Sequence, residues 1–212
     1  MLMVISQLVH DHSLVTVFAA LFICLMSGWL IAVIFERAGA ARQQWRHFWH
    51  IGVAFVAGLG VWMTHFLAMI GYRPDLPLTY GVTLTVISVI IGVVCVGLPL
   101  ALTSYIEERG WRGVIGGSSG LGIAAMHMTG MSALSGCIQE YSLQSTVVSC
   151  LLGMAIMAVC GASQRLRERP VLWSLVFTAA VCSVHFVSIG GTTLTELPDL
   201  VIAQSDKNML AW

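Results

Sequence analysis

Three histidines recur at similar intervals along a very apolar chain. They are His65, His127 and His185, separated by 62 and 58 residues, and they lie in the stretches GLGVWMTHFLAM, GLGIAAMHMTGM and AAVCSVHFVSIG. A histidine within a membrane span is costly unless it has a partner, so it indicates a functional site. Imidazole is also the commonest metal ligand, and we interpret the three as ligands of one metal site. For His185 a second interpretation, a packed histidine bonded to a carbonyl, stays equally open.

Methionines accompany two of these histidines. Met69 and Met131 follow His65 and His127 by four residues, which places each pair on one face of a helix. Met126 directly precedes His127, and these three methionines are the stronger ligand candidates. Mixed thioether and imidazole ligands favour copper over zinc, which prefers His, Cys and carboxylate. Because no charged residue lies near the cluster, the site would be neutral, and Cu(I) is favoured over Cu(II).

Two further residues complete the predicted ligand set. Met63 lies close to His65 in the sequence, although filling a gap in the core is the safer interpretation for it. His10 precedes the first apolar stretch, and we keep it as a secondary ligand because metal sites often recruit a flanking histidine. A Cu(I) ion with an open position could bind O2, CO or NO, which enter readily through lipid.

The composition places the chain in a membrane. Of its 212 residues, 58% are hydrophobic and only 9% are charged, whereas about a quarter are charged in a soluble domain. The formal net charge is zero, which gives no support to nucleic-acid binding. The chain has no paired carboxylates, no phosphate-binding loop and no nucleophile with a base, so we predict that it is not an enzyme.

Six stretches reach the length of about 20 apolar residues that a membrane span needs. We predict an all-α membrane protein with one domain over residues 1–212 and with spans at residues 13–35, 48–70, 79–104, 113–135, 143–163 and 171–191. Short connections make neighbouring spans antiparallel, so the second, fourth and sixth run in the same direction. Each of these three carries one of the histidines at a similar height, which indicates a two-helix unit used three times.

The positive charges predict the orientation. On one side of the membrane, the only positively charged residues are Arg73 and Lys207, and most of the acidic residues lie on that side too. The opposite side has three connections with eight arginines, namely Arg37, Arg42, Arg46, Arg109, Arg112, Arg165, Arg167 and Arg169. By the positive-inside rule the arginine-bearing loops are cytoplasmic and the N-terminus is outside. We therefore predict a multi-pass protein of the bacterial inner membrane, surrounded by membrane lipids, with the histidines near the outer face.

The residues around His127 resemble the motif of the MHYT domain, a bacterial integral-membrane sensor module. The motif reads MHMT at residues 126–129, with GLGIAA before it and GM after it, and the resemblance covers nearly the whole chain, including the His10-Asp11 pair. It implies three outward-running helices that repeat the motif. It also implies copper binding, sensing of a diatomic gas or of redox state, and output through cytoplasmic domains that make or degrade cyclic di-GMP.

The chain departs from that family pattern in several places. The motif tyrosine is Met128, the first copy reads MTHF at residues 63–66, and the third reads VHFV at residues 184–187 without a methionine. The family usually has a seventh span that leads to an output domain, whereas this sequence stops at Trp212 without one. We expect either a fragment of a longer protein or signalling through a partner, and a homodimer stays open.

Two other functions also stay open. A haem protein would use two of the three histidines as axial ligands, although methionines within one turn would crowd a porphyrin. A copper-handling transporter would need Met and His residues through the whole bilayer, whereas the predicted cluster is confined to the outer half. Retinal photosensing is excluded because the only lysine, Lys207, lies outside the spans, so no Schiff base can form there.

Overall fold

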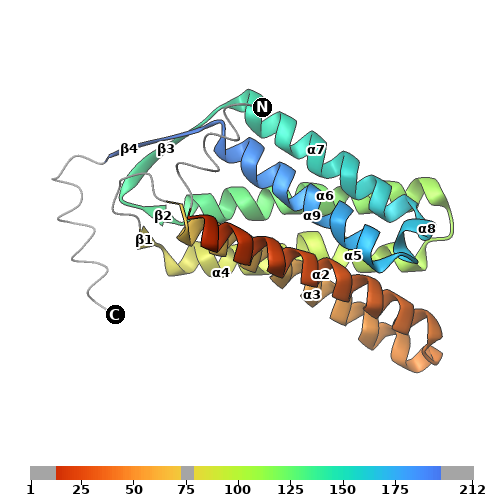
Figure 1. The fold of residues 1–212 in the computed structure, drawn as a ribbon. Coiled ribbons are helices and arrows are strands. Elements are labelled where there is room, and N and C mark those ends of the chain that lie inside the picture. The colour runs from red at the N-terminus through yellow and green to blue at the C-terminus, as the bar shows by residue number, and fades with distance from the viewer. Residues whose placement is uncertain (1–12, 73–78, 197–212) are drawn as a thin grey trace.

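The computed structural model describes residues 13–72 and 79–196, and these residues form six long helices (Figure 1). The helices are α2 (Leu14–Ala40), α3 (Gln43–Ile70), a composite helix over residues 82–105, α6 (Arg109–Ser132), α7 (Leu143–Ala162) and α9 (Pro170–Ile189). The composite helix joins α4 (Val82–Ile91), the π-helical turn η1 (Gly92–Gly97), α5 (Leu98–Leu102) and the 3-10 turn η2 (Thr103–Tyr105). A short helix, α8 (Gln164–Arg167), lies between α7 and α9. Each predicted span overlaps one long helix.

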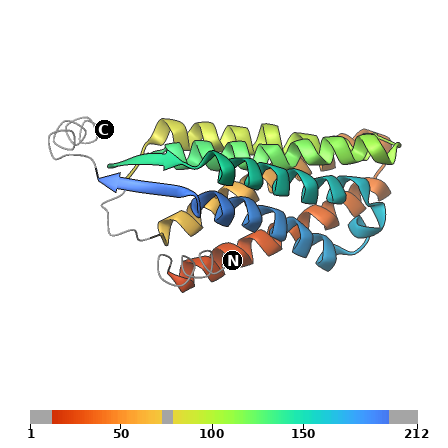
Figure 2. The ribbon, with the colours of Figure 1, turned by 90° about the horizontal axis from the view of Figure 1, so that it is seen from above.

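Five of these helices, namely α2, α3, the composite helix, α7 and α9, are long and apolar enough to cross a membrane. The remaining helix, α6, has 24 residues and occupies the position of the predicted fourth span. Its many glycine and serine residues lower its hydropathy, so α6 is not among the five. It nevertheless packs against the others within the bundle (Figure 2). The chain is thus a mostly helical, multi-pass membrane protein, and the sixth span stays a prediction.

The helices form three pairs, which we call repeat 1 (α2 and α3), repeat 2 (the composite helix and α6) and repeat 3 (α7 and α9). The second helix of each pair, which we call the inner helix, carries one of the three histidines. Each inner helix packs against its own outer helix and also against the outer helix of another repeat, because α3 contacts η1, α6 contacts α7 and α9 contacts α2. The three repeats therefore close into a ring.

One backbone hydrogen bond recurs in every repeat. The residue that precedes the outer helix donates its N–H to a carbonyl at the end of the inner helix, six residues beyond the histidine. The three bonds run from Ser13 to Gly71, from Gly81 to Ala133 and from Ser142 to Gly191, over 2.8, 2.7 and 2.8 Å. Such bonds satisfy backbone groups that helix ends leave unpaired. Because all three bonds sit at equivalent positions, each histidine lies at the same distance along the chain from the bond that closes its own repeat.

Small residues let neighbouring repeats approach closely at equivalent positions. A Cβ atom added to Gly28 of α2 would lie 2.8 Å from the Cα atom of Ser174 in α9, and one added to Gly116 of α6 would lie 2.8 Å from the Cα atom of Gly161 in α7. At the third interface, a Cβ atom on Gly97 would collide with the backbone of Ala54. Membrane helices associate through such small-residue contacts because lipid provides no hydrophobic driving force between them.

Four short strands cover one end of the described bundle, and the all-helical prediction missed them. The strand β1 (Thr79–Tyr80) pairs with β2 (Leu134–Ser135), and β3 (Cys137–Tyr141) pairs with β4 (Thr192–Glu196), both antiparallel. The alternation of buried and exposed residues in β3 covers only five residues, too few to stand out beside the long apolar runs. We call this end the sheet end, and we call the opposite end, which has the arginine-bearing connections, the arginine end.

Candidate metal centre

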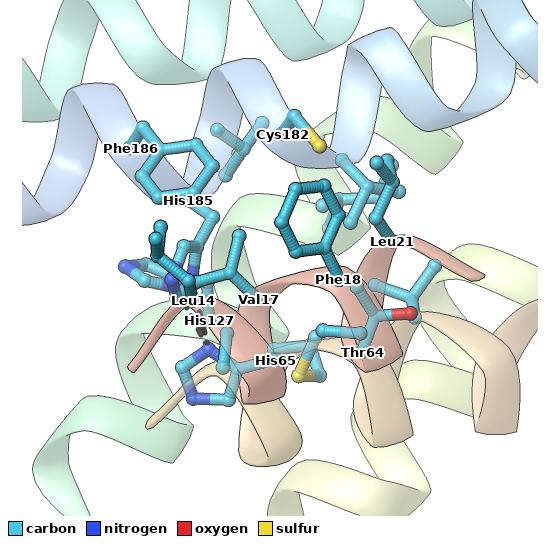
Figure 3. A pocket seen from close by; sticks show the side chains of 17 residues that line it. Leu14, Val17, Phe18, Leu21, Thr64, His65, His127, Cys182, His185 and Phe186 are labelled. Carbon is cyan, nitrogen blue, oxygen red and sulfur yellow. Dashed lines mark hydrogen bonds between the residues drawn. The ribbon is translucent and has the colours of Figure 1, made fainter. Parts of the chain in front are cut away.

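His65, His127 and His185 meet inside the bundle, one from each inner helix. Their exposed fractions are 3%, 2% and 6%. The ring centres lie 4.8 Å apart for His65 and His127, 5.5 Å for His65 and His185, and 5.2 Å for His127 and His185. Figure 3 shows the three labelled rings together. The parallel course of the inner helices and the equal heights of the histidines thus bring residues 120 positions apart into contact.

The Nδ1 atoms of the three rings face one another. The Nδ1 atom of His65 lies 3.1 Å from that of His127 and 3.4 Å from that of His185, and all three residues offer a ligand atom within 4.8 Å of one another. An ion bound to imidazole at about 2.0–2.1 Å would hold its nitrogen ligands roughly 3.3–3.6 Å apart in tetrahedral or trigonal geometry. The 3.4 Å spacing lies within this range and the 3.1 Å spacing lies slightly below it, so small ring shifts would let the nitrogens share an ion.

Hydrogen bonds alone satisfy this arrangement poorly. Each neutral imidazole has one N–H donor and one lone-pair acceptor on its two nitrogens. The Nδ1 atom of His65 faces two other Nδ1 atoms, so a single proton or a single lone pair on it can serve one neighbour well and the other badly. A cation at the centre would accept a lone pair from all three nitrogens at once. The three nitrogens thus suit a bound metal ion better than they suit hydrogen bonds among the imidazoles alone.

The opposite nitrogens are buried in apolar surroundings. The Nε2 atoms of His65 and His127 are buried without a hydrogen-bond partner in the described chain. The Nε2 atom of His65 faces Gly130 of α6, where an added Cβ atom would come within 2.5 Å of it. Metal-bound histidines usually donate their second N–H to a carboxylate, a carbonyl or water. This site differs, because it positions the ring of His65 by close packing against a glycine.

No charged side chain of the described residues lines the cavity beside the three histidines. The residues that line the adjoining cavity are all neutral, and the one hydroxyl among them, that of Thr64, donates to the carbonyl of Gly60 over 2.7 Å. A carboxylate would compensate the charge of a divalent ion, and no carboxylate from the part of the chain that the structure describes lines this cavity. The environment therefore favours an ion of low charge.

The predicted methionine ligands take three different positions. Met126 is 1% exposed and lines the same cavity as the histidines. Met69 and Met131 are equally buried and lie one turn nearer the sheet end, where they form a second layer with Ile189. Met63, in contrast, is 46% exposed on the surface of α3, so the structure does not bring it into the cluster. The sequence favoured a gap-filling role in the core for Met63, and its exposed position on α3 does not fit that role.

His10, the secondary ligand candidate, lies outside the described residues. Two residues of the centre were not singled out from the sequence. Ile189 occupies in repeat 3 the position that Met69 and Met131 occupy in the other repeats, four residues beyond the histidine. Gly130 entered the sequence analysis only within the GM that follows the MHMT motif, although its spacing from His127 could have indicated that it faces a neighbouring inner helix.

A second group of histidines lies at the arginine end. The Nδ1 atoms of His47 and His50 lie 2.7 and 2.6 Å from the hydroxyl oxygen of Tyr105. His47 is exposed and His50 is buried. Their pairing with Tyr105 links α3 to the end of the composite helix.

Arg167 of α8 joins the three repeats at the arginine end. Its guanidinium donates to the hydroxyls of Thr103 and Ser104 over 2.8 and 3.1 Å, and it lies 4.1 Å from the ring centre of Phe35 and 5.9 Å from that of Trp173. Burial, with a smaller contribution from the nearby charge of Arg112, lowers the pKa of Arg167 to about 10. The side chain stays cationic at neutral pH and connects α2, η2 and α9.

The helices and the threefold repeat define a multi-pass membrane protein built from helix pairs. The family model named MHYT, described as a bacterial signalling protein N-terminal repeat, matches residues 58–117 and 120–179. The chain belongs to the MHYT family, which confirms the resemblance noted in the sequence. The two matched segments contain His65 and His127, and His185 lies beyond the second of them.

Relatives with similar sequences are signalling proteins. A cyclic di-GMP phosphodiesterase of Pseudomonas aeruginosa, NbdA, is 29% identical over 99% of this chain, and a signalling protein of Caulobacter vibrioides is 30% identical over 96% of it. The bifunctional diguanylate cyclase and cyclic di-GMP phosphodiesterase MucR of Pseudomonas aeruginosa is 32% identical over 60% of the chain. The matched region covers 28%, 25% and 19% of these proteins, so the chain spans about a quarter of their length or less. No solved structure matches the chain.

Proposed function

We propose that this chain is a membrane sensor domain that binds copper through its three histidines and responds to a diatomic gas or to redox state. The observation that carries the proposal is the convergence of three Nδ1 atoms at spacings of 3.1 and 3.4 Å in a buried, uncharged site. Soft or borderline ligands without a carboxylate suit Cu(I) better than Zn²⁺ or Mg²⁺. When bound, Cu(I) would supply a coordination position for O2, CO or NO.

His65, His127 and His185 would hold the ion through their Nδ1 atoms. Met126, which is buried beside them, is the first candidate for a fourth ligand. Met69 and Met131 form the next layer toward the sheet end, and they would shield the ion from water rather than contact it directly. Their thioethers would also offer a soft, apolar surface on the route between the sheet end and the histidines.

The proposed output is a change in how the inner helices pack. A ligand shifts a conformational equilibrium only if its affinity differs between the two packings. Because each repeat contributes one histidine, a change of ligation at the centre would act on α3, α6 and α9 together. At the arginine end, Arg167 and the pairing of His47 and His50 with Tyr105 connect the same repeats, so a shift in packing would reach this end as well.

The orientation and the partners are also part of the proposal. Eight arginines lie at one end, and by the positive-inside rule we infer that this end is cytoplasmic and that the sheet end lies outside an inner bacterial membrane. NbdA and MucR are named for cyclic di-GMP turnover. We infer that this chain passes its signal to a cytoplasmic domain or partner of that kind, either within a longer protein or in a complex such as a homodimer.

The structure gives less support to the two alternatives. In a bis-histidine haem site the porphyrin lies between its axial ligands, whereas here the imidazoles contact one another, with ring centres 4.8 to 5.5 Å apart. For a copper transporter, a path of ligands would have to continue to the arginine end. The described core in that direction is filled by large apolar side chains, including Leu100, Trp173 and Phe177.

The test is a metal analysis of purified protein after exposure to Cu(I). We expect wild type to retain copper and His127→Ala to lose most of it while remaining inserted in the membrane, since one side chain does not decide insertion. The matched control is His47→Ala, because His47 lies at the arginine end and should leave the copper content unchanged. Wild-type protein that takes up no copper would overturn the proposal. A Soret band in the spectrum of the purified protein would show that the bound cofactor is haem and would contradict the copper proposal.

A further inference from the structure

A cavity of about 240 Å³ adjoins the three histidines, and all three line it (Figure 3). Its walls come from α2, α3, α6 and α9, and its accessible surface is entirely apolar. Five of the lining residues belong to α2, the outer helix of repeat 1, which contributes no histidine. They are Leu14, Val17, Phe18, Ala20 and Leu21.

The side chains of α2 place this cavity at the lipid-facing surface. Phe18 is 66% exposed and Leu14 is 49% exposed, and both line the cavity. They belong to a helix that is long and apolar enough to cross a membrane, so their exposed faces would contact acyl chains rather than water. Figure 3 shows Phe18 and Val17 on the α2 side of the cavity, with the histidine rings close to them. The cavity thus leads from the α2 surface to the buried imidazoles.

The two ends of the bundle are more tightly closed. Toward the sheet end, the buried side chains of Met69, Met131 and Ile189 pack against partly buried tyrosines. Toward the arginine end, Trp173 and Phe177 are fully buried. Among the described residues, the accessible side of the histidine cluster is therefore the one that α2 borders.

We propose that this cavity is a lateral entry and binding site for a small, neutral, apolar molecule that reaches the histidines from the bilayer. An apolar cavity of roughly 150 Å³ stays dry and binds benzene or xenon, so this volume has room for a molecule of that size or smaller. Outside the histidine cluster, anions and hydrated ions in the apolar part of the cavity would lose their water without gaining a polar partner. The cavity therefore selects a diatomic gas over a charged ligand. Only the role of the metal at its inner end depends on the proposed function.

The cavity is tested with xenon on metal-free protein. Crystals of metal-free wild type grown in a lipid mesophase would be pressurised with xenon, whose anomalous scattering locates each bound atom. We expect a xenon atom among Phe18, Ala68 and the histidine rings. Absence of xenon there, or an acyl chain filling the cavity, would overturn the proposal, and neither measurement needs a variant.

Two variants on α2 make the test specific. Val17 lines the cavity, whereas Val15 is 78% exposed on the same helix and does not line it. We expect Val17→Phe to abolish xenon binding and Val15→Phe to retain it. In copper-loaded protein, recombination of CO after flash photolysis should be slower in Val17→Phe than in Val15→Phe. Equal xenon occupancy in both variants would contradict the proposal.

These results separate the two proposals. Copper binding without xenon binding would overturn the cavity proposal and support the metal site. Xenon binding without copper binding would support the cavity proposal and overturn the metal site.

Discussion

Gly130 of α6 and His65 of α3 are in direct contact: a Cβ atom added to the glycine would lie 2.5 Å from the Nε2 atom of the histidine. Because α6 also carries His127, this close approach lets the Nδ1 atoms of His65 and His127 come within 3.1 Å. The glycine thus determines the position of one proposed ligand without contacting the ion.

Replacing this glycine should weaken metal binding. In Gly130→Ala the new methyl group displaces the ring of His65, and we expect copper affinity to fall about 10- to 100-fold, as for other changes in groups that orient metal ligands. A competition titration with a Cu(I) chelator measures the affinity. The control is Gly39→Ala, because nothing lies within 4 Å of a Cβ atom there. Unchanged affinity in Gly130→Ala would show that packing does not position His65.

The buried and exposed methionines should differ as copper ligands. Met126 lies beside the histidines, whereas Met63 is 46% exposed on α3. We expect Met126→Leu to lower Cu(I) affinity about tenfold, equivalent to ~1.4 kcal/mol, and Met63→Leu to leave it unchanged. Leucine conserves the volume of methionine, so the comparison isolates the sulfur atom. Equal affinities in the two variants would remove Met126 from the ligand set.

Arg167 should stabilise the arginine end more than its neighbour does. Arg167→Gln removes the bonds to Thr103 and Ser104 and the contact with Phe35, and we expect the free energy of unfolding to fall by about 1–3 kcal/mol. Arg165 belongs to the same short helix and is exposed, so Arg165→Gln is the matched control. Thermal unfolding in detergent compares the two. If both variants unfold at the same temperature, the contacts of Arg167 do not stabilise the packing of the repeats.

Tyr80 should make stability depend on pH in the alkaline range. Burial raises the pKa of Tyr80 in β1 to about 12, above its ordinary value of 10. Between pH 10 and pH 12 the unfolded chain releases the proton and the folded chain retains it, so stability is complete below pH 10 and falls as the pH rises. The Tyr80→Phe variant has no ionisable hydroxyl at this position, so it lacks this pH-dependent contribution to stability. Between pH 10 and pH 12, the unfolding temperature of the variant should therefore fall less than that of wild type. If the two temperatures fall equally, groups other than Tyr80 cause the loss of stability.

The arrangement of the histidines could be predicted because it depends on long-range regularities. The similar spacing of His65, His127 and His185, together with short connections, predicts three parallel helices with imidazoles at one height. Their facing nitrogens could not be predicted, because the choice between Nδ1 and Nε2 depends on side-chain rotation. That rotation is set by neighbours such as Gly130, which lies on another helix.

Other features depend on contacts that periodicity does not encode. The strands β3 and β4 are five residues each, and their pairing joins segments from repeats 2 and 3 that are far apart in the sequence. The cavity was not predicted because α2 contributes only apolar side chains to it, and an apolar residue in a span gives no signal that distinguishes packing from a vacant volume. Met63 and Met126 likewise differ in orientation rather than in type.

The ring of three repeats limits the stoichiometry of the centre. Each helix pair contributes a single imidazole to the shared position, so one pair alone cannot surround an ion, and two pairs leave it open on one side. The smallest unit that offers an ion three histidine ligands contains three pairs. A relative with fewer pairs per chain would have to assemble several chains around one ion to reproduce the same centre.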